Sequence, residues 1–424
     1  MRKTRIFAAL AATTALALAG CTGGGPSSSD QPIDTDGTIE GEITFQTWSL
    51  KNEKFSPYFE QLVKDFEEKY PGTKINWIDQ PGEGYEQKVL QQANSNELPD
   101  VVNLPDTFAY QLAQAGKLVD LKKADPELEN TYVAGGLEGY TFDDLDGTWA
   151  YPWYLGTDLD WWNMTELKEY GVDAPPTSHE EWIAKAKEVA EKSGGKVHMA
   201  SSLPTTADFT ENGIDLMKDG KFAFNTPEAE KILQEFVDLY QAGAMPAETL
   251  NGDYAGNAAM FTQGKVAYTT ATPSFVTQLS DDAPSMLDDV EPSPRFMTPP
   301  LFVQGISVSQ DSKNPALALE FAKFATNNDN QVEFVKLARG FLPGTKAANE
   351  NPEAIVEGIE DPLLAEAVKI AASQMDRAKG TEYIQFNDDM NKFFQGQVAL
   401  AMQGKATVKE ALDAAVDYCN KALD

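Results

Sequence analysis

The sequence predicts an α/β fold, because segments typical of β-strands alternate with segments typical of amphipathic helices. Three such strand and helix pairs follow one another between residues 41 and 116. Strands that alternate with helices are joined by right-handed crossovers, which indicates a mainly parallel sheet in this part of the chain. The chain of 424 residues is long enough for two domains with a large core.

The first strand is expected at residues 41–48, where the side chains alternate in character with a period of two. Residues 57–72 place apolar side chains at helical spacing and end in Pro-Gly, which is typical of a helix stop. The same patterns then predict a strand at residues 73–79, a helix at 85–96, a strand at 99–104 and a helix at 107–116.

Beyond Pro152, long amphipathic helices dominate the pattern. The expected elements are helices at residues 178–194 and 227–243, a strand at 301–309, and helices at 314–328 and 407–423. The first two of these helices end in glycine, which is common at a helix C-terminus. Cys419 belongs to the apolar stripe of the last helix and is expected to be a packed core thiol.

The N-terminal segment is typical of a secretion signal, because a basic start is followed by a short Ala/Leu-rich run at residues 6–19. This run is too short to span a bilayer, which takes roughly 20 apolar residues. The sequence LAGC that ends at Cys21 resembles the bacterial lipobox, which implies cleavage before Cys21 and a diacylglycerol on its thiol. The alternative is an ordinary secretion signal with an incidental cysteine. Residues 22–37 are rich in Gly, Ser, Pro and Asp and are interpreted as a flexible tether.

The composition is strongly acidic. Removal of residues 1–20 would take away three of the 34 basic residues and none of the 66 acidic ones, leaving a net charge of about −35. Such a chain repels nucleic acid and anionic membrane surfaces, so neither is an expected partner. Three arginines would remain, which are few for a site that must recognise phosphate or carboxylate. With Cys21 acylated, Cys419 would have no partner, so no disulfide framework is expected.

Catalytic, metal and cofactor sites find little support. His179 and His198 are the only histidines, and neither metal-ligand spacing nor a GxSxG motif is present. A carboxylate pair for glycoside hydrolysis always remains an alternative among 66 acidic residues, but pairs arise by chance at that density. The chain is therefore expected to be no enzyme and to carry no metal and no cofactor.

Several sequence pieces occur together in one order: FEEKYPGTKINW, LPDVVNL, AQAGKLVDL, DGTWAYPW, AAMFTQGKVAY and KNPALALEFAKF. Together they resemble the extracellular solute-binding proteins of carbohydrate ABC importers, the bacterial solute-binding protein family 1 that includes maltose-binding protein. The resemblance implies a bilobal periplasmic-binding-protein-like fold, in which two α/β lobes are joined by a multi-strand hinge. It places lobe 1 at residues 41–150 and 305–345 and lobe 2 at residues 151–304 and 346–424.

The resemblance also implies a function. The chain is expected to be a lipid-anchored, monomeric receptor on the extracellular face of the bacterial cytoplasmic membrane. It would bind a sugar, more specifically an oligosaccharide, and deliver it to the permease subunits of an ABC importer. The alternatives are a binding protein for a peptide, a polyol or glycerol phosphate, and a lipid-anchored glycoside hydrolase.

Candidate ligand contacts combine aromatic rings, which stack on the C–H faces of sugars, with planar polar groups, which bind hydroxyls. Four of the seven tryptophans lie within residues 147–163; of these, Trp153 is expected to face the ligand, whereas Trp161 and Trp162 also suit a core. Asp106, the best match to a family contact, is alternatively an N-cap for the helix that follows. The resemblance implies contacts in the loops after the first strand and after PDVV, and with them the full set of expected contacts is Trp48, Asn52, Asn103, Asp106, Trp153, Tyr154, Thr157, Asp158, Ser274, Phe275, Gln304, Gly305 and Phe341.

Overall fold

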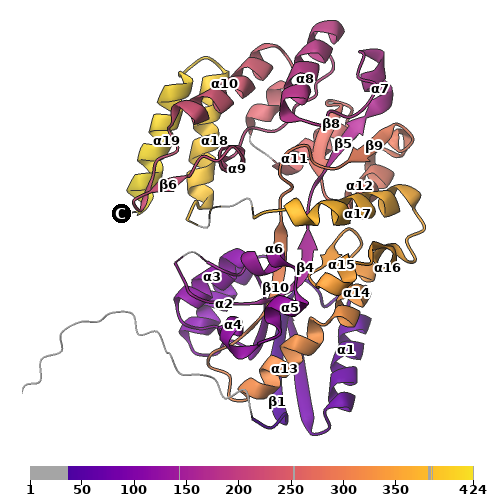
Figure 1. The fold of residues 1–424 in the computed structure, drawn as a ribbon, viewed down its shortest axis with the longest axis vertical. Coiled ribbons are helices and arrows are strands. Elements are labelled where there is room, and N and C mark those ends of the chain that lie inside the picture. Colours follow the sequence, from indigo (N-terminus) through magenta and orange to yellow (C-terminus); the bar gives the residue numbers. More distant parts are fainter. Residues whose placement is uncertain (1–36, 143, 252–253, 381–382, 384, 424) are drawn as a thin grey trace, which may run out of the picture. The chain divides into compact units, whose positions relative to one another are not determined.

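The computed structural model describes residues 37–142, 144–251, 254–380, 383 and 385–423 (Figure 1). The expected secretion signal, the expected lipid attachment at Cys21 and nearly all of the expected tether lie outside these residues. The first strand begins at Gly41, where the sequence places the start of the folded part. None of the described helices is both long enough and apolar enough to cross a membrane.

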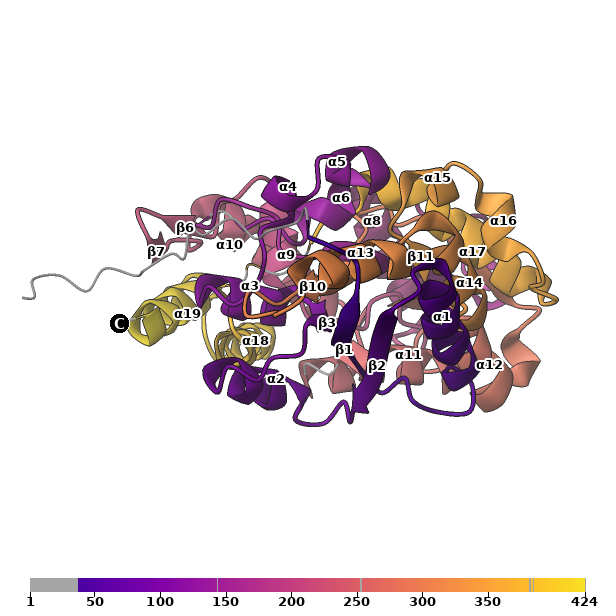
Figure 2. The same cartoon turned by 90° about the horizontal axis from the view of Figure 1, so that it is seen from below.

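A six-stranded sheet has the strand order β11-β4-β10-β3-β1-β2. Strand β1 (Gly41–Trp48) lies between β2 (Thr73–Gln80) and β3 (Val101–Pro105) and is parallel to both (Figure 2). The remaining strands are β10 (Phe302–Val308), β4 (Tyr151–Gly156) and β11 (Leu342–Pro343), and each pairing among them and with β3 is antiparallel.

The prediction of a mainly parallel sheet is therefore correct for the first three strands and wrong for the other three. The reason is that β4, β10 and β11 are not added by strand-helix-strand crossovers. They lie next to the connections between this sheet and the rest of the chain. Each of them runs antiparallel to the strands with which it pairs.

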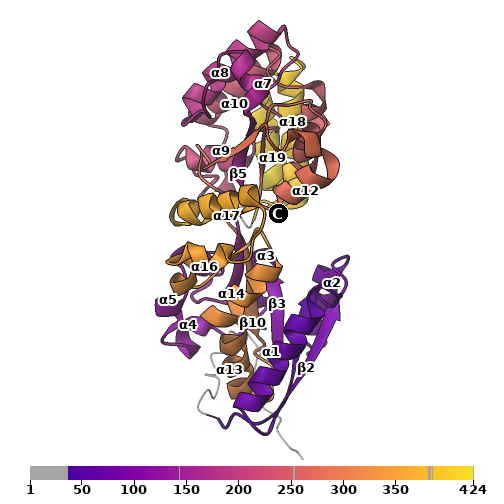
Figure 3. The same cartoon turned by 90° about the vertical axis from the view of Figure 1, so that its right-hand side faces the viewer.

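Helices cover this sheet. Helix α1 (Ser56–Lys69) packs against β2, and α13 (Pro315–Ala325) packs against β10, β3 and β1 (Figure 3). The others that contribute are α2 (Tyr85–Asn94), α3 (Asp106–Gln114), α4 (Leu121–Ala124), α5 (Leu128–Thr131), α6 (Ala134–Glu138), α14 (Asn328–Leu337), α15 (Lys346–Asn349) and α16 (Pro352–Val356). The buried apolar residues of these elements form a hydrophobic cluster that we call the first core.

A three-stranded antiparallel sheet has the order β8-β5-β9, formed by Tyr268–Ala271, Leu159–Asn163 and Val290–Ser293. Trp161 of β5 belongs to the first core, whereas Trp162 belongs to a second cluster, which we call the second core. Both tryptophans are fully buried, as expected for core residues, so both faces of this short sheet are covered.

Helices α8 (His179–Ser193), α10 (Pro227–Gln241), α18 (Asp388–Met402) and α19 (Val408–Leu423) build most of the second core. Helices α18 and α19 pack against each other and against α10. Cys419 of α19 is fully buried, as predicted, and burial raises the pKa of its thiol to about 11.

The smaller elements in this part of the chain include α7 (Met164–Glu169), α9 (Thr206–Glu211), α11 (Tyr254–Thr262), α12 (Phe275–Asp282), α17 (Pro362–Gln374) and the hairpin of β6 (Met217–Lys218) and β7 (Lys221–Phe222).

The chain passes from the six-stranded to the three-stranded sheet between β4 and β5, and it returns between β9 and β10. Strands β4 and β10 pair with each other, and their register shifts between Gln304 and Gly305. A Cβ atom on Gly305 would lie 2.6 Å from the ring of Tyr140, so only glycine fits this close approach. The expected lobe boundaries after residues 150 and 304 fall just before β4 and within β10, both strands of the larger sheet.

Candidate functional site

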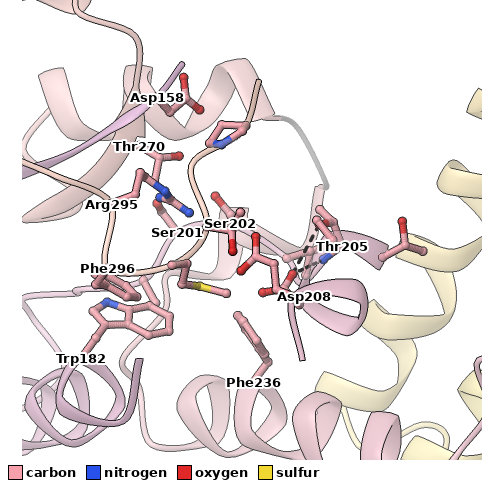
Figure 4. A pocket seen from close by; sticks show the side chains of 18 of the residues that line it. Asp158, Trp182, Ser201, Ser202, Thr205, Asp208, Phe236, Thr270, Arg295 and Phe296 are labelled. Carbon is pink, nitrogen blue, oxygen red and sulfur yellow. Dashed lines mark hydrogen bonds between the residues drawn. The ribbon is translucent and has the colours of Figure 1, made fainter. Parts of the chain in front are cut away.

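A pocket of about 410 Å³ opens beside the three-stranded sheet (Figure 4). Its walls come from α8, from the segment that leads into α9, from α9 itself, from α10, from β8, from the segment between β9 and β10, and from α18. Stretches that are far apart in the sequence therefore line one pocket. Cavities of this size that combine apolar walls with a few polar groups are typical of small-molecule sites.

Aromatic side chains form the apolar wall. Trp182 of α8 stacks on Phe296 with a centroid distance of 5.6 Å and an interplanar angle of 29°, and Phe236 of α10 lies 6.1 Å from Trp182. The indole N–H of Trp182 donates to the carbonyl of Met199 at 2.7 Å, which holds the ring in place. Figure 4 shows Trp182 and Phe296 side by side. The wall is rigid, because each ring is packed against another ring.

A buried ion pair anchors one side of the pocket. The guanidinium of Arg295 donates to Asp160 Oδ1 at 2.8 Å, and the carboxylate of Asp160 is fully buried. The hydroxyl of Tyr268 donates to the same oxygen at 2.9 Å, and the backbone N–H of Phe296 donates to Oδ2 at 3.0 Å. Burial raises the pKa of Asp160, and the positive charge of Arg295 counteracts that rise. The pair therefore fixes Arg295 in the pocket wall and neutralises it.

Two carboxyl groups of the short helix α9, those of Asp208 and Glu211, also line the pocket. Asp208 Oδ2 accepts from the backbone N–H of Thr205 at 2.7 Å and from its hydroxyl, which closes a capping box (Figure 4). Burial raises the pKa of Asp208. Burial also raises the pKa of Glu211 to about 7, and the charge of Asp208 adds to this rise.

Hydroxyl and amide groups complete the lining. The side chains of Ser201 and Asn257 are hydrogen-bonded to each other, and Asn257 Nδ2 donates to Thr270 Oγ1 at 3.3 Å. Thr249 is 3% exposed, and its hydroxyl has no hydrogen-bond partner among the described residues. A buried hydroxyl without a partner is costly, so Thr249 is suited to a bond with a polar ligand or a water. No group of three or more His, Cys, Asp or Glu among the described residues is arranged to hold a metal ion.

Of the contacts expected from the sequence, Asp158 lines this pocket. Thr157 next to it is buried, and its hydroxyl accepts from Gln374 Nε2 at 3.3 Å. Ser274 and Phe275 line a separate, more open pocket. Phe275 is only 3% exposed and packs edge-on against Trp161, so its ring belongs mainly to the first core.

A second group of expected contacts meets in the six-stranded sheet. The side chain of Asn103 donates to Gln304 Oε1 and to the carbonyl of Gly305, both at 3.1 Å. Asn103 and Gly305 are buried, whereas Gln304 is half-buried. Asp106 is the first residue of α3, one position later than an N-cap, and its carboxylate accepts from the N–H of Thr107 at 2.8 Å.

Trp153 was expected to face a ligand, but the structure places it in the first core. Its ring is 1% exposed and lies 4.4 Å from Phe334, 5.0 Å from Tyr154 and 5.9 Å from Phe59. No face of the indole is open to a sugar in this arrangement. The physical reason is that β4 is buried on both faces, so Trp153 would be covered whichever side of the strand it pointed to.

The remaining expected contacts are dispersed. Trp48 is half-buried and stacks on Tyr85 at 5.6 Å. Asn52 is exposed, and its side-chain oxygen Oδ1 accepts from the N–H groups of Lys54 and Phe55 in the turn before α1. Phe341 is half-buried and lies edge-on to Tyr154 at 5.0 Å.

The sequence interpretation missed most of the pocket. Trp182 and Phe236 read as the apolar stripes of amphipathic helices, and nothing in the pattern separates a pocket-lining ring from a core ring. Arg295 is the one lining residue that the sequence could have pointed to, because arginines are few in this acidic chain. A paired arginine of that kind is a candidate for a built site.

Glu211→Gln should change how stability depends on pH. Since the pKa of Glu211 rises from 4.5 to about 7 on folding, the folded chain holds this proton where the unfolded chain has released it. The free energy of unfolding should therefore fall as pH rises from about 4.5 to about 7 in the wild type. In the variant this loss should disappear. The melting temperature of the variant minus that of the wild type should therefore increase as pH rises from about 4.5 to about 7.

Glu188→Gln provides the matched control, because two lysines lower the pKa of the exposed Glu188 to about 2. The difference in melting temperature between Glu188→Gln and the wild type should vary with pH only below about 4.5. Melting curves from pH 4 to pH 8 decide the matter: parallel wild-type and Glu211→Gln profiles would contradict a buried, proton-binding Glu211.

Comparisons with known proteins agree with this architecture. The sequence profile of the bacterial extracellular solute-binding proteins matches residues 52–332. The diacetylchitobiose binding protein DasA of Streptomyces coelicolor is 22% identical in an alignment 398 residues long that covers 88% of each chain. Among solved structures, a proposed oligosaccharide periplasmic-binding protein from Synechococcus sp. MITs9220 is 25% identical with a TM-score of 0.74, covering 90% of this chain and 98% of that one.

The cyclic α-maltosyl-1,6-maltose binding protein of Arthrobacter globiformis has a TM-score of 0.71 at 21% identity, covering 91% of this chain and 99% of that one. These likenesses confirm the bilobal periplasmic-binding-protein fold expected from the sequence. With two strand connections between its sheets, a polar and aromatic pocket and a profile match over most of its length, the chain belongs to the bacterial extracellular solute-binding protein family.

Proposed function

We propose that this protein is the extracellular receptor of an ABC importer and that its ligand is an oligosaccharide. The observation that carries the proposal is the pocket, in which the packed rings of Trp182, Phe236 and Phe296 face hydroxyl and carboxylate groups. Sugars present both an apolar C–H face and a ring of hydroxyls, so a site for them needs both kinds of wall. The pocket has both.

The charges of the pocket favour a neutral ligand over an anionic one. Three lining residues are acidic, namely Asp158, Asp208 and Glu211, and Arg295 is the one basic residue among the described lining residues. Because Arg295 already pairs with the buried Asp160, it does not offer a free positive charge to a phosphate or a carboxylate. Glycerol phosphate and acidic peptides are therefore poor candidates, whereas carboxylates are good acceptors for sugar hydroxyls.

The relatives support the same ligand class. The Streptomyces coelicolor relative is named for diacetylchitobiose, and the Arthrobacter globiformis protein for a cyclic maltosyl-maltose. Both names describe oligosaccharides, although they differ in sugar and linkage. We take from them the class of ligand and not its identity.

In this proposal, half-buried residues of the other lobe contact the same ligand. They are Trp48 and Gln304 of the six-stranded sheet and Asp106 at the start of α3. A ligand that is held from both lobes stabilises a closed conformation, since the second set of contacts exists only there.

A glycan panel tests the proposal. Gluco-, galacto- and N-acetylglucosamine-based sugars of one to six units are added separately, and the melting temperature of the protein is followed. A ligand that binds only the folded chain raises the free energy of unfolding by about 2.7 kcal/mol at a hundred times its dissociation constant, so at least one series should raise the melting temperature.

Glycerol 3-phosphate and a galacturonate oligosaccharide are the matched anionic controls, and both should leave the melting temperature unchanged. Binding of an anion in place of every neutral sugar would refute the proposed ligand class. The best neutral sugar should also be recovered intact after long incubation, because the family relatives are binding proteins. Shortened products would point instead to a glycoside hydrolase.

We also propose that the mature chain is attached by a lipid at Cys21 to the outer face of the cytoplasmic membrane and acts there as a monomer with the permease subunits. The support is the LAGC sequence behind a short apolar run. Fractionation of cells that express the wild type or Cys21→Ser tests the attachment. The wild type should sediment with membranes and the variant should not; equal distribution of the two would refute the anchor.

A further inference from the structure

We infer that Phe302 is a stacking surface for a second ring of the ligand, outside the enclosed part of the pocket, so that the ligand has at least two sugar rings. This inference rests on the proposed function, because it assigns a subsite within the same pocket.

The first observation is the exposure of Phe302. It lines the pocket, yet it is 42% exposed, whereas Trp182 and Phe236 on the packed wall are each 5% exposed. Phe302 thus lies where the pocket meets solvent. Single exposed apolar residues are common on protein surfaces, and Leu400 and Leu423 are exposed to a similar degree. What distinguishes Phe302 is its place at the mouth of a polar and aromatic pocket.

The second observation is what surrounds the ring. Phe302 begins β10 and pairs with Gly156, the last residue of β4. Because Gly156 has no side chain, it does not cover the phenyl group. The rings of Phe302 and Phe341 both lie 3.5 Å from the position that a Cβ atom on Gly156 would take. Two phenyl groups therefore flank one glycine.

These contacts extend the aromatic wall beyond the pocket. Phe302 and Phe341 both lie beside Gly156, and the half-buried Phe341 lies edge-on to Tyr154; we call these three aromatic residues the strip. Two of its residues, Tyr154 of β4 and Phe302 of β10, lie on paired strands of the six-stranded sheet, close to where the chain connects to the three-stranded sheet. A ligand that fills the pocket and continues along this strip must carry more than one ring.

The strip also has the right chemistry for this role. An exposed phenyl face offers area to the C–H face of a sugar and makes no demand on its hydroxyls. The enclosed part of the pocket, with its carboxylates and hydroxyls, orients one ring by hydrogen bonds. Phe302 should therefore contribute affinity for longer ligands and little selectivity among their hydroxyl patterns.

Phe302→Ala and Phe302→Leu test the inference by calorimetric titration with the sugars of the panel that bind, each measured as monosaccharide, disaccharide and tetrasaccharide. Because the ring is exposed, both variants should keep the melting temperature of the wild type without ligand. We expect both to bind the tetrasaccharide about tenfold more weakly and the monosaccharide as well as the wild type does. Phe302→Tyr should retain wild-type affinity, since it keeps the ring.

Leu400→Ala on α18 is the matched control, because it removes an apolar side chain of similar exposure that does not line the pocket. Equal tetrasaccharide affinity of wild type and Phe302→Leu would overturn the inference, and so would an equal loss for monosaccharide and tetrasaccharide. If the wild type binds no sugar of any length, the proposed function fails and the inference fails with it. These three results are distinct from one another.

Discussion

Arg295→Ala should lower the free energy of unfolding by about 3 to 5 kcal/mol, the loss found when one partner of a buried ion pair is removed. Asp160 would be left fully buried with only Tyr268 and the Phe296 N–H as partners. Because burial already raises the pKa of Asp160, the carboxyl group of the variant should take up a proton more readily. The destabilisation should therefore shrink as pH falls.

Chemical denaturation of four proteins measures this effect: wild type, Arg295→Ala, Asp160→Asn and the double variant. Replacement of both charges should cost much less than the sum of the two single losses, because neither charge is then buried alone. Additive losses, or a loss in Arg295→Ala below about 1 kcal/mol, would contradict a coupled buried pair.

Trp153→Ala should lower the free energy of unfolding by a similar amount, about 3 to 5 kcal/mol, because it removes a large ring from a packed core. The ring contacts Phe59, Tyr154 and Phe334, so its loss leaves a cavity that these neighbours cannot fill without moving. Trp153 does not line the pocket, so the affinity of the folded variant for sugar should stay at the wild-type value.

Trp153→Phe is the matched control, since it keeps most of the ring and should lose less stability. Denaturation and calorimetric titration of both variants at a temperature where they remain folded separate the two roles of the residue. An unchanged free energy of unfolding together with weakened sugar binding would show that Trp153 contacts the ligand and would contradict its role as a core residue.

Much of the fold could be predicted from the sequence, because long periodic segments carry their own signal. The strand at Gly41–Trp48 and the helix at Val408–Leu423 agree with the expected ranges to within one residue. The helix buries one apolar stripe, and the apolar side chains Ile43 and Phe45 of the strand alternate with polar ones, so a period of 3.6 or of two is visible in the pattern. The family resemblance supplied the crossings between the sheets, which periodicity alone does not give.

The site was harder, because its parts are adjacent only in the folded chain. Asp160 and Arg295 are separated by 135 positions, and no local pattern connects them. Trp153 shows a second limit: strand β4 is buried on both faces along most of its length, so alternation cannot tell which aromatic residue faces a ligand. The expected contacts also came from the family resemblance, whereas this pocket is lined by rings of α8 and α10.

Gln374 at the end of α17 has a consequence for how the protein is made. Its amide donates to the carbonyl of Asp158 at 2.7 Å, and its oxygen accepts from the backbone N–H of Arg295 at 2.9 Å. One late side chain thus bridges the two segments that hold the buried ion pair, and Asn391 and Gln395 line the same pocket from α18. During synthesis, which proceeds from the N-terminus, the pocket cannot be complete until the residues up to Gln395 have left the ribosome. Translation must therefore pass Gln395 before the pocket has all of its lining residues.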